Sequence, residues 1–120
     1  MEKRRFALMI CAGPYGSESS SLAYLFAREA VKRHKLEGVF FYEDGVLNAL
    51  KTVSPASDEF DLVRAWQSLS REHGVRLVLC SAAGLRRGVG LEVAETGFEI
   101  GSLSDLSHLV VQGARLVQFR

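Results

Sequence analysis

Cys80 is the residue with the clearest chemical potential, because it stands where a buried strand is predicted to become a helix. The stretch Leu77–Gly88, LVLCSAAGLRRG, is an apolar run that ends at Cys80 and continues into small residues and two arginines. A cysteine at a helix N-terminus lies beside free backbone N–H groups and the positive end of the helix dipole, which favours the nucleophilic thiolate. Free cysteines are also among the most buried residue types. Position alone therefore leaves a reactive and a merely packed Cys80 equally open.

Arg86 and Arg87 follow Cys80 by six and seven residues. In a regular helix this spacing corresponds to about 10 Å, which is too far for a direct ion pair with the sulfur. The simplest interpretation of both arginines is a solvated cationic surface. They could also dock an anionic partner or pair with the protein's own carboxylates, and the sequence does not choose among these roles.

The other chemically suggestive motifs favour structural interpretations. Cys11 precedes a flexible turn, so packing is the better interpretation of this second cysteine. The turn AGPYGS after Cys11 has neither the GK[ST] ending of a phosphate-binding loop nor the spacing GxGxxG. A turn explains the pair Glu43–Asp44 as well as metal binding or acid–base chemistry does. Trp66 lies on a predicted helix face and is expected in the core.

Composition excludes several classes of protein. The 120 residues suffice for one domain, and 48% hydrophobic with 24% charged residues is typical of a globular protein. A net charge of +1 argues against a large phosphate-binding surface. Two cysteines without a CxxC or Cys/His pattern indicate neither a disulfide framework nor zinc, and a reducing cytosol is the natural setting. The apolar run Phe6–Ala12 is predicted to be a buried strand rather than a secretory signal.

Alternating strand and helix signals must position these residues. Apolar runs predict strands at Phe6–Cys11, Gly38–Tyr42, Val75–Cys80, near Phe98–Ile100, and at Ala114–Phe119. Helices are predicted to follow caps at Ser17, at Ser57 or Asp58, and at Ser102 or Ser104. A longer connection after Tyr42 has room for one helical turn, and residues 90–97 read as a loop with weak helical character.

Two helical faces and the strand pattern together predict the fold class. The apolar face of the first helix is expected to comprise Leu22, Ala23, Phe26, Ala27, Ala30 and Val31, and that of the second Leu62, Val63, Trp66 and Leu69. Continuous apolar strands alternating with helices predict a parallel sheet that is covered on both faces. We therefore expect a single three-layer α/β/α domain over residues 1–120, with about five parallel strands. Reactive groups gather at the carboxyl ends of strands in such sheets, which is where Cys80 stands.

Three long segments resemble the DsrE/TusD family of intracellular sulfur-relay proteins, and within it the TusD branch most closely. They are FALMICAGPYGSESSSLAYLFAREA, VFFYEDGVLNALKTVSPASDEFDLVRAWQSLSREHGV and LVLCSAAGLRRGV. The motif SPASDEFDLVRAW followed by C-x-A-A-x-L-R-R-G-V carries the resemblance, which covers nearly the whole chain. It is loosest over residues 90–100.

The resemblance implies a cytoplasmic sulfurtransferase without metal or organic cofactor. Cys80 matches the family's cysteine that carries sulfane sulfur as a persulfide, whereas Cys11 has no role in that pattern. The implied partners are TusC-like and TusB-like subunits in a hetero-hexamer, a TusA-like sulfur donor and a TusE/DsrC-like acceptor. The implied product is 2-thiouridine at the wobble position of tRNA, without direct contact with nucleic acid or a membrane. Arg86 and Arg87 would then dock the acceptor or line a subunit interface.

Three other functions stay open at this point. A DsrE-type subunit has the same chemistry but serves sulfur oxidation. A non-catalytic assembly subunit would have an inert Cys80. A flavodoxin-like protein would bind a nucleotide at the AGPYG turn.

Overall fold

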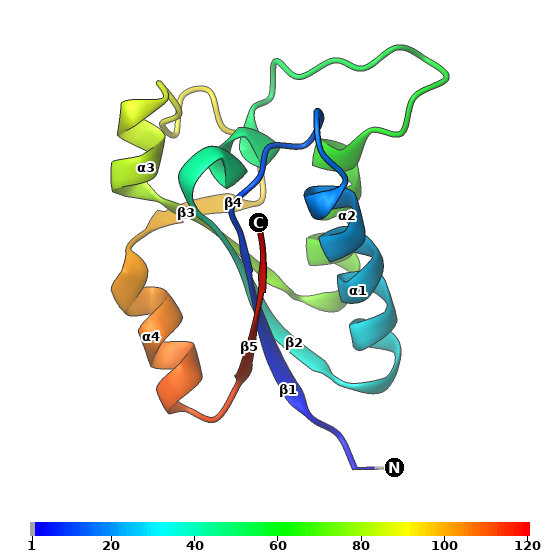
Figure 1. Cartoon of the computed structure of the whole chain (residues 1–120), viewed down its shortest axis with the longest axis vertical. Coiled ribbons are helices and arrows are strands. Elements are labelled where there is room, and N and C mark those ends of the chain that lie inside the picture. The colour runs from blue at the N-terminus through cyan, green and yellow to red at the C-terminus, as the bar shows by residue number, and fades with distance from the viewer. Residues whose placement is uncertain (1) are drawn as a thin grey trace.

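Five parallel strands form the centre of the molecule in the computed structural model, which describes residues 2–120 (Figure 1). The strands are β1 (Arg5–Ile10), β2 (Lys35–Phe41), β3 (Arg76–Cys80), β4 (Phe98–Gly101) and β5 (Arg115–Phe119). Their order in the sheet is β4-β3-β2-β1-β5, with every neighbouring pair parallel. The sheet grows from β1 toward β4, and β5 then joins the other side of β1. The predicted α/β class with five parallel strands is confirmed.

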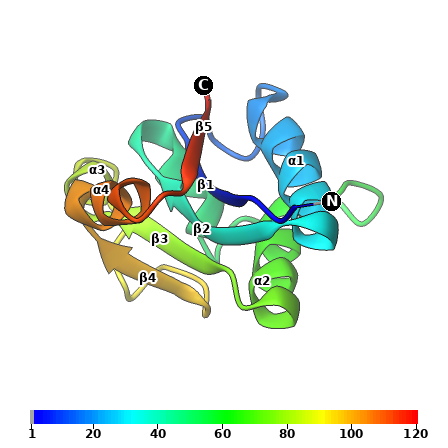
Figure 2. The same cartoon turned by 90° about the horizontal axis from the view of Figure 1, so that it is seen from below.

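Helices cover both faces of this sheet. Helices α1 (Ser19–Arg33) and α2 (Leu62–His73) pack on one face, and α4 (Leu103–Val111) lies on the other (Figures 1 and 2). The short helix α3 (Ser81–Arg86) stands at the carboxyl end of β3, on the side of α4. A 3-10 helix, η1 (Glu43–Ala49), follows β2 at the same end and provides the helical turn expected there. The carboxyl edge of the sheet is therefore built from α3, η1 and the turn after β1.

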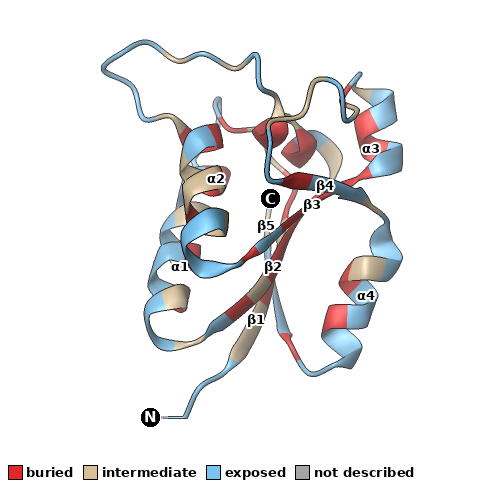
Figure 3. Cartoon of the chain, turned by 180° about the vertical axis from the view of Figure 1, so that it is seen from behind, coloured by how far each residue is buried: buried red, intermediate tan, exposed pale blue. Residues whose placement is uncertain are grey.

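The core lies on both faces of the central strands, beneath α1 and α2 on one side and beneath α4 on the other, and its buried segments are red in Figure 3. All four residues predicted for the inner face of α2 are buried: Leu62, Val63, Trp66 and Leu69. The Trp66 ring is fully enclosed and meets the ring of Phe41 edge to face at 5.6 Å. The prediction that Trp66 belongs to the core is confirmed.

The start of α1 differs from the prediction, and its buried face differs from it at Leu22. The N-cap is Glu18 rather than Ser17, so the helix begins one residue later than a Ser17 cap requires. Leu22, predicted on the inner face, exposes 49% of its surface. Phe26 and Val31, also predicted, are partly buried against the core. Ala23, Ala27 and Ala30 are buried as predicted, together with Ser20, and all four of these side chains are small. They allow the helix to lie close to the sheet, and this close packing turns Leu22 outward.

Helix α2 begins later than predicted because the preceding residues form a projecting loop (Figure 1). The N-cap is Asp61, whose carboxylate accepts a hydrogen bond from the Arg64 amide at 3.2 Å, and neither Ser57 nor Asp58 caps the helix. The Tyr15 hydroxyl donates to the Phe60 carbonyl at 2.7 Å, which anchors the loop in a non-helical course. The end of α2 is as predicted, with Gly74 in the left-handed region at φ 67°.

The start of β2 differs from the prediction, whereas the start of α4 agrees with it. Strand β2 begins at Lys35 instead of Gly38, because the Lys35 amide already donates to the Arg4 carbonyl at 2.9 Å. Helix α4 is capped by Ser102, one of the two predicted residues, in a capping box with Asp105. Residues 90–97 form turns and one isolated bridge, Leu50 to Ala94. The Ala94 amide donates to the Gly90 carbonyl at 3.0 Å, so this stretch is a loop with one helical turn, as predicted.

Candidate functional site

Cys80 is both the last residue of β3 and the N-cap of α3, as the sequence predicts. Its backbone is still extended, with φ −65° and ψ 119°, and Ser81 opens the helix. The residue exposes 5% of its surface, so its sulfur is largely covered in this structure. Ser81 and Ala82, which follow it, are exposed. Cys80 therefore lies at the rim of the core, one residue from open solvent.

The register of the sheet places Tyr42 beside Cys80 and Cys11 beside Tyr42. Phe41 pairs with Leu79 and Ile10 pairs with Phe41, so the next residue on each strand continues the same row. The Tyr42 amide donates to the Ile10 carbonyl at 2.9 Å, which carries the ladder one step beyond the named strands. Neighbouring strands lie about 4.8 Å apart, so the α-carbons of the two cysteines are separated by about 10 Å.

All three side chains of this row point to the α4 side of the sheet. Side chains along a strand alternate between its faces. Gly38 faces α4, because a β-carbon built on it would meet Leu109 at 3.4 Å, so Phe40 and Tyr42 face α4 as well. Ladder neighbours share a face, which puts Cys80 and Cys11 on the same side. The carboxyl edge thus presents two thiols with a tyrosine between them.

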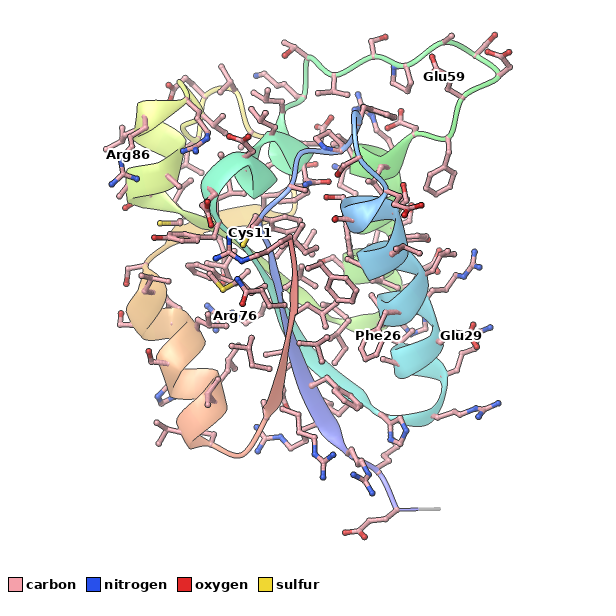
Figure 4. All side chains as sticks on the ribbon, viewed as in Figure 1. Cys11, Phe26, Glu29, Glu59, Arg76 and Arg86 are labelled. Carbon is pink, nitrogen blue, oxygen red and sulfur yellow. The ribbon has the colours of Figure 1, made fainter. Side chains whose placement is uncertain are left out.

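Cys11 is buried beside polar groups at the end of β1 (Figure 4). Its amide donates to the Phe119 carbonyl at 2.8 Å, and the Gln118 side-chain amide donates to its sulfur at 3.6 Å. Burial raises the pKa of the Cys11 thiol, the Gln118 hydrogen bond partly offsets this, and the Glu43 carboxylate raises it further. The neutral thiol is therefore favoured, in keeping with the predicted packing role.

The two arginines after Cys80 have different surroundings. The Arg87 guanidinium donates to the Asp44 carboxylate at 2.7 Å and to the Ala83 carbonyl at 3.1 Å, which joins α3 to η1. Arg86 is exposed on α3 and points away from the sheet (Figure 4). Of the roles open for these residues, pairing with the protein's own carboxylates is the one that the structure records for Arg87.

Asp44 and its neighbours make a tight connection after β2. Glu43 adopts the left-handed region at φ 50°, which is uncommon for a residue with a side chain. Gly45 follows because the chain passes directly over the end of β1, and a β-carbon here would lie 1.9 Å from the Ile10 carbonyl oxygen. The acidic pair thus stands in a turn, which was one of its two predicted interpretations.

Asn48 organises the carboxyl edge and was missed by reasoning from the sequence. It is fully buried, and its amide nitrogen donates to the carbonyls of Ala12 at 3.0 Å and Gly45 at 2.9 Å. Its oxygen accepts from the Trp66 indole at 3.3 Å, while Ser20 donates to the same Ala12 carbonyl at 2.7 Å. The only signal in the sequence is an asparagine among apolar residues, in GVLNAL. These bonds close the AGPYGS turn onto η1 and α2.

Within residues 2–120, no three His, Cys, Asp or Glu side chains are grouped in a way that could hold a metal ion. Over the same residues, no helix combines the length and apolar character needed to cross a membrane.

Comparison with known proteins adds close relatives of nearly equal length. The chain is 46% identical over 127 aligned residues to the "Sulfurtransferase TusD" of Erwinia tasmaniensis, covering 96% of this chain and 99% of the relative. It is 44% and 45% identical to proteins of the same name from Serratia proteamaculans and Klebsiella pneumoniae, covering at least 95% of this chain and 98% of each relative.

Solved structures agree with the fold. The ychN protein from E. coli superimposes with a TM-score of 0.76 at 22% identity, covering 96% of this chain and 99% of the other. Protein MTH1491 from Methanobacterium thermoautotrophicum gives 0.75 at 16% identity, with 97% and 99% covered. The model of the DsrE/DsrF-like family matches residues 4–119. With its family match, its relatives and its five-stranded parallel sheet in agreement, the chain belongs to the DsrE/DsrF-like family.

Proposed function

We propose that this protein is a sulfurtransferase that carries sulfane sulfur as a persulfide on Cys80. The observation that carries the proposal is the similarity, over nearly the full length, to three proteins named Sulfurtransferase TusD at 44–46% identity. The position of Cys80, at the carboxyl end of a central strand, supports it, because reactive groups of parallel sheets gather there.

The chemistry is an exchange at sulfur that needs no external oxidant or reductant. The Cys80 thiolate attacks the terminal sulfur of a donor persulfide, R–S–SH. A new S–S bond forms on Cys80 while the S–S bond of the donor breaks, and the donor leaves as its thiolate with the electron pair of that bond. Delivery to the acceptor repeats the step, with the acceptor's cysteine as nucleophile and Cys80 as leaving group.

The limited exposure of Cys80 suits a carrier of reactive sulfur. A persulfide in open solvent is lost to small thiols, whereas a residue that exposes 5% of its surface is protected from them. A partner's cysteine reaches it only after local rearrangement at the rim. The exposed Ser81 and Ala82 leave room for another backbone to approach at this point.

The partners in this proposal are a TusA-like donor and a TusE/DsrC-like acceptor, with TusC-like and TusB-like subunits completing a hetero-hexamer. Arg86 is the docking residue for an acidic surface of such a partner, since its side chain is exposed and directed outward from the helix that follows Cys80. Arg87 contributes less to docking, because its guanidinium is already paired with Asp44. The sulfur is destined for the wobble 2-thiouridine of tRNA.

Intact-mass measurement tests the proposal. After incubation with a persulfidated donor and removal of the donor, the wild-type protein and Cys11→Ser should each gain the mass of one sulfur atom, whereas Cys80→Ser should gain none. A gain of sulfur by Cys80→Ser, or its loss in Cys11→Ser only, contradicts the assignment.

The destination of the sulfur needs a separate measurement in the host. Deleting the gene should abolish 2-thiouridine in tRNA, with restoration by the wild type but not by Cys80→Ser. Unchanged 2-thiouridine alongside impaired sulfur oxidation would assign the protein to oxidation instead. Restoration by Cys80→Ser would indicate an assembly role.

A further inference from the structure

Something must cover the Cys80 sulfur, because the residue is at the edge of the core yet exposes only 5% of its surface. Along the row of strand ends it has two neighbours, Gly101 on β4 and Tyr42 on β2. Gly101 has no side chain of its own, and the space above it is occupied by Val78 and Asp105, whose side-chain atoms would lie 2.6 Å from a β-carbon at this position. Tyr42 is the one neighbour in this row with a side chain large enough to reach across the sulfur.

The placement of Tyr42 fits a cover. Its α-carbon lies about 4.8 Å from that of Cys80, and both side chains point to the α4 side of the sheet. The ring packs against the same hydrophobic core cluster that includes Cys80, and it lies 6.5 Å from the ring of Phe40. Tyr42 is nevertheless only half-buried, so its outer part remains in contact with solvent. A half-buried side chain can rotate outward without disturbing the backbone of the sheet.

We propose that Tyr42 is a positioning residue whose ring covers the Cys80 sulfur and must move aside before a partner's cysteine can reach it. The inference rests on the proposed sulfurtransferase function for its biological meaning. Its physical content, the coverage of one thiol by one ring, is independent of that function. The ring also stands between Cys80 and Cys11, and thus separates the two thiols of the protein.

The separation has a chemical consequence. If Cys11 attacked a Cys80 persulfide at its inner sulfur, an internal disulfide would form and hydrogen sulfide would leave, so that the carried sulfur is lost. A disulfide requires α-carbons within about 7 Å, and this row holds them about 10 Å apart. The strand that carries Tyr42 therefore keeps a second thiol from discharging the first.

The test is the rate at which Cys80 reacts with N-ethylmaleimide, followed by peptide mass spectrometry to separate it from Cys11. Cys80 in Tyr42→Ala should be labelled about three- to ten-fold faster than in the wild type, since the loss of a ring–sulfur contact changes a rate by up to about tenfold. Tyr42→Phe keeps the ring and should label at the wild-type rate. Tyr42→Leu, which preserves core packing better, serves if Tyr42→Ala fails to fold, and should also label faster.

Tyr24→Ala is the matched control, because it removes another half-buried tyrosine, one that packs on Trp66 on the opposite face of the sheet. It should leave Cys80 labelling unchanged. Wild-type labelling in Tyr42→Ala overturns the proposal, as does equal acceleration in Tyr42→Phe or Tyr24→Ala. Labelling needs no sulfur donor, so its outcome is distinct from that of the mass measurement on the sulfurtransferase.

With a donor present, the persulfide of Tyr42→Ala should decay to glutathione several-fold faster than that of Tyr42→Phe. Equal decay rates overturn the shielding role even where labelling differs.

Discussion

Replacing Asn48 by alanine should cost much of the stability of the protein. Asn48 and Trp66 are both fully buried, and the substitution leaves the Trp66 indole N–H and the Gly45 carbonyl without the partner they have now. The Ala12 carbonyl keeps its bond from Ser20 at 2.7 Å. Each buried group left unsatisfied costs about 1–3 kcal/mol, so we expect a loss of about 2–6 kcal/mol. The free energy of unfolding of a domain of this size is about 5–15 kcal/mol.

Urea denaturation followed by tryptophan fluorescence and far-UV circular dichroism measures this loss. Gln67→Ala is the matched control, because the Gln67 amide donates to Thr96 at 2.8 Å where water can replace it, and it should cost less than about 1 kcal/mol. In a Trp66→Phe background, which has no tryptophan and is followed by circular dichroism alone, Asn48→Ala should cost about 1–3 kcal/mol less, since the indole N–H is already gone. A loss below about 1 kcal/mol for Asn48→Ala would refute the network as a stabilising element.

Two further predictions concern the carboxyl edge. Gly45→Ala places a β-carbon 1.9 Å from the Ile10 carbonyl oxygen, so it should destabilise the protein by about 3 kcal/mol or more. Gly16→Ala is the control, because Gly16 has open space around it but φ 97°, and this substitution should cost about 1 kcal/mol. Thermal unfolding compares the two variants, and equal costs would contradict the close approach at Gly45. The raised pKa of Cys11 means that folding favours its neutral thiol. This stabilisation is complete below the ordinary thiol pKa and is lost as the pH rises through the pKa of the folded state, so the stability difference between wild type and Cys11→Ala should shrink in alkali. Urea titrations at several pH values measure this difference, and a difference that does not change with pH contradicts the prediction.

The strands and the inner face of α2 were predictable because their signals are local. Five apolar runs mark β1 to β5, and the spacing of Leu62, Trp66 and Leu69 fixes one side of a helix without reference to the rest of the chain. The glycine after His73 likewise ends α2 through its own backbone freedom. These features need no knowledge of distant residues.

The mistaken boundaries depend on contacts that are distant in sequence. SPASDEFD offers several capping residues, and the bond from Tyr15 to the Phe60 carbonyl, across 45 residues, belongs to the arrangement that leaves Asp61 as the cap. Leu22 is exposed because small residues, not large ones, set the approach of α1 to the sheet. The helical spacing of apolar residues does not show how closely the helix approaches the sheet.

Cys80 was predictable from the sequence as a single residue, but its neighbours in the candidate site were not. The strand-to-helix boundary at Cys80 was visible in the sequence, and its role as a sulfur carrier came from the family resemblance. The row Cys11–Tyr42–Cys80 requires the order and register of three strands, which local patterns do not determine. Asn48 was missed for the same reason, since three of its four partners, Ala12, Ser20 and Trp66, come from other segments of the chain.

The pairing of β5 with β1 joins two segments that are far apart in the sequence. Gln118 and Cys11 touch although 107 residues separate them, and the Phe119 carbonyl receives the Cys11 amide. During synthesis, β1 emerges from the ribosome long before its outer neighbour exists, so one flank of the nascent sheet stays unpaired until β5 has been made. Closing so long a loop is slow, and a chain without β5 would leave Cys11 and the outer side of β1 open to water.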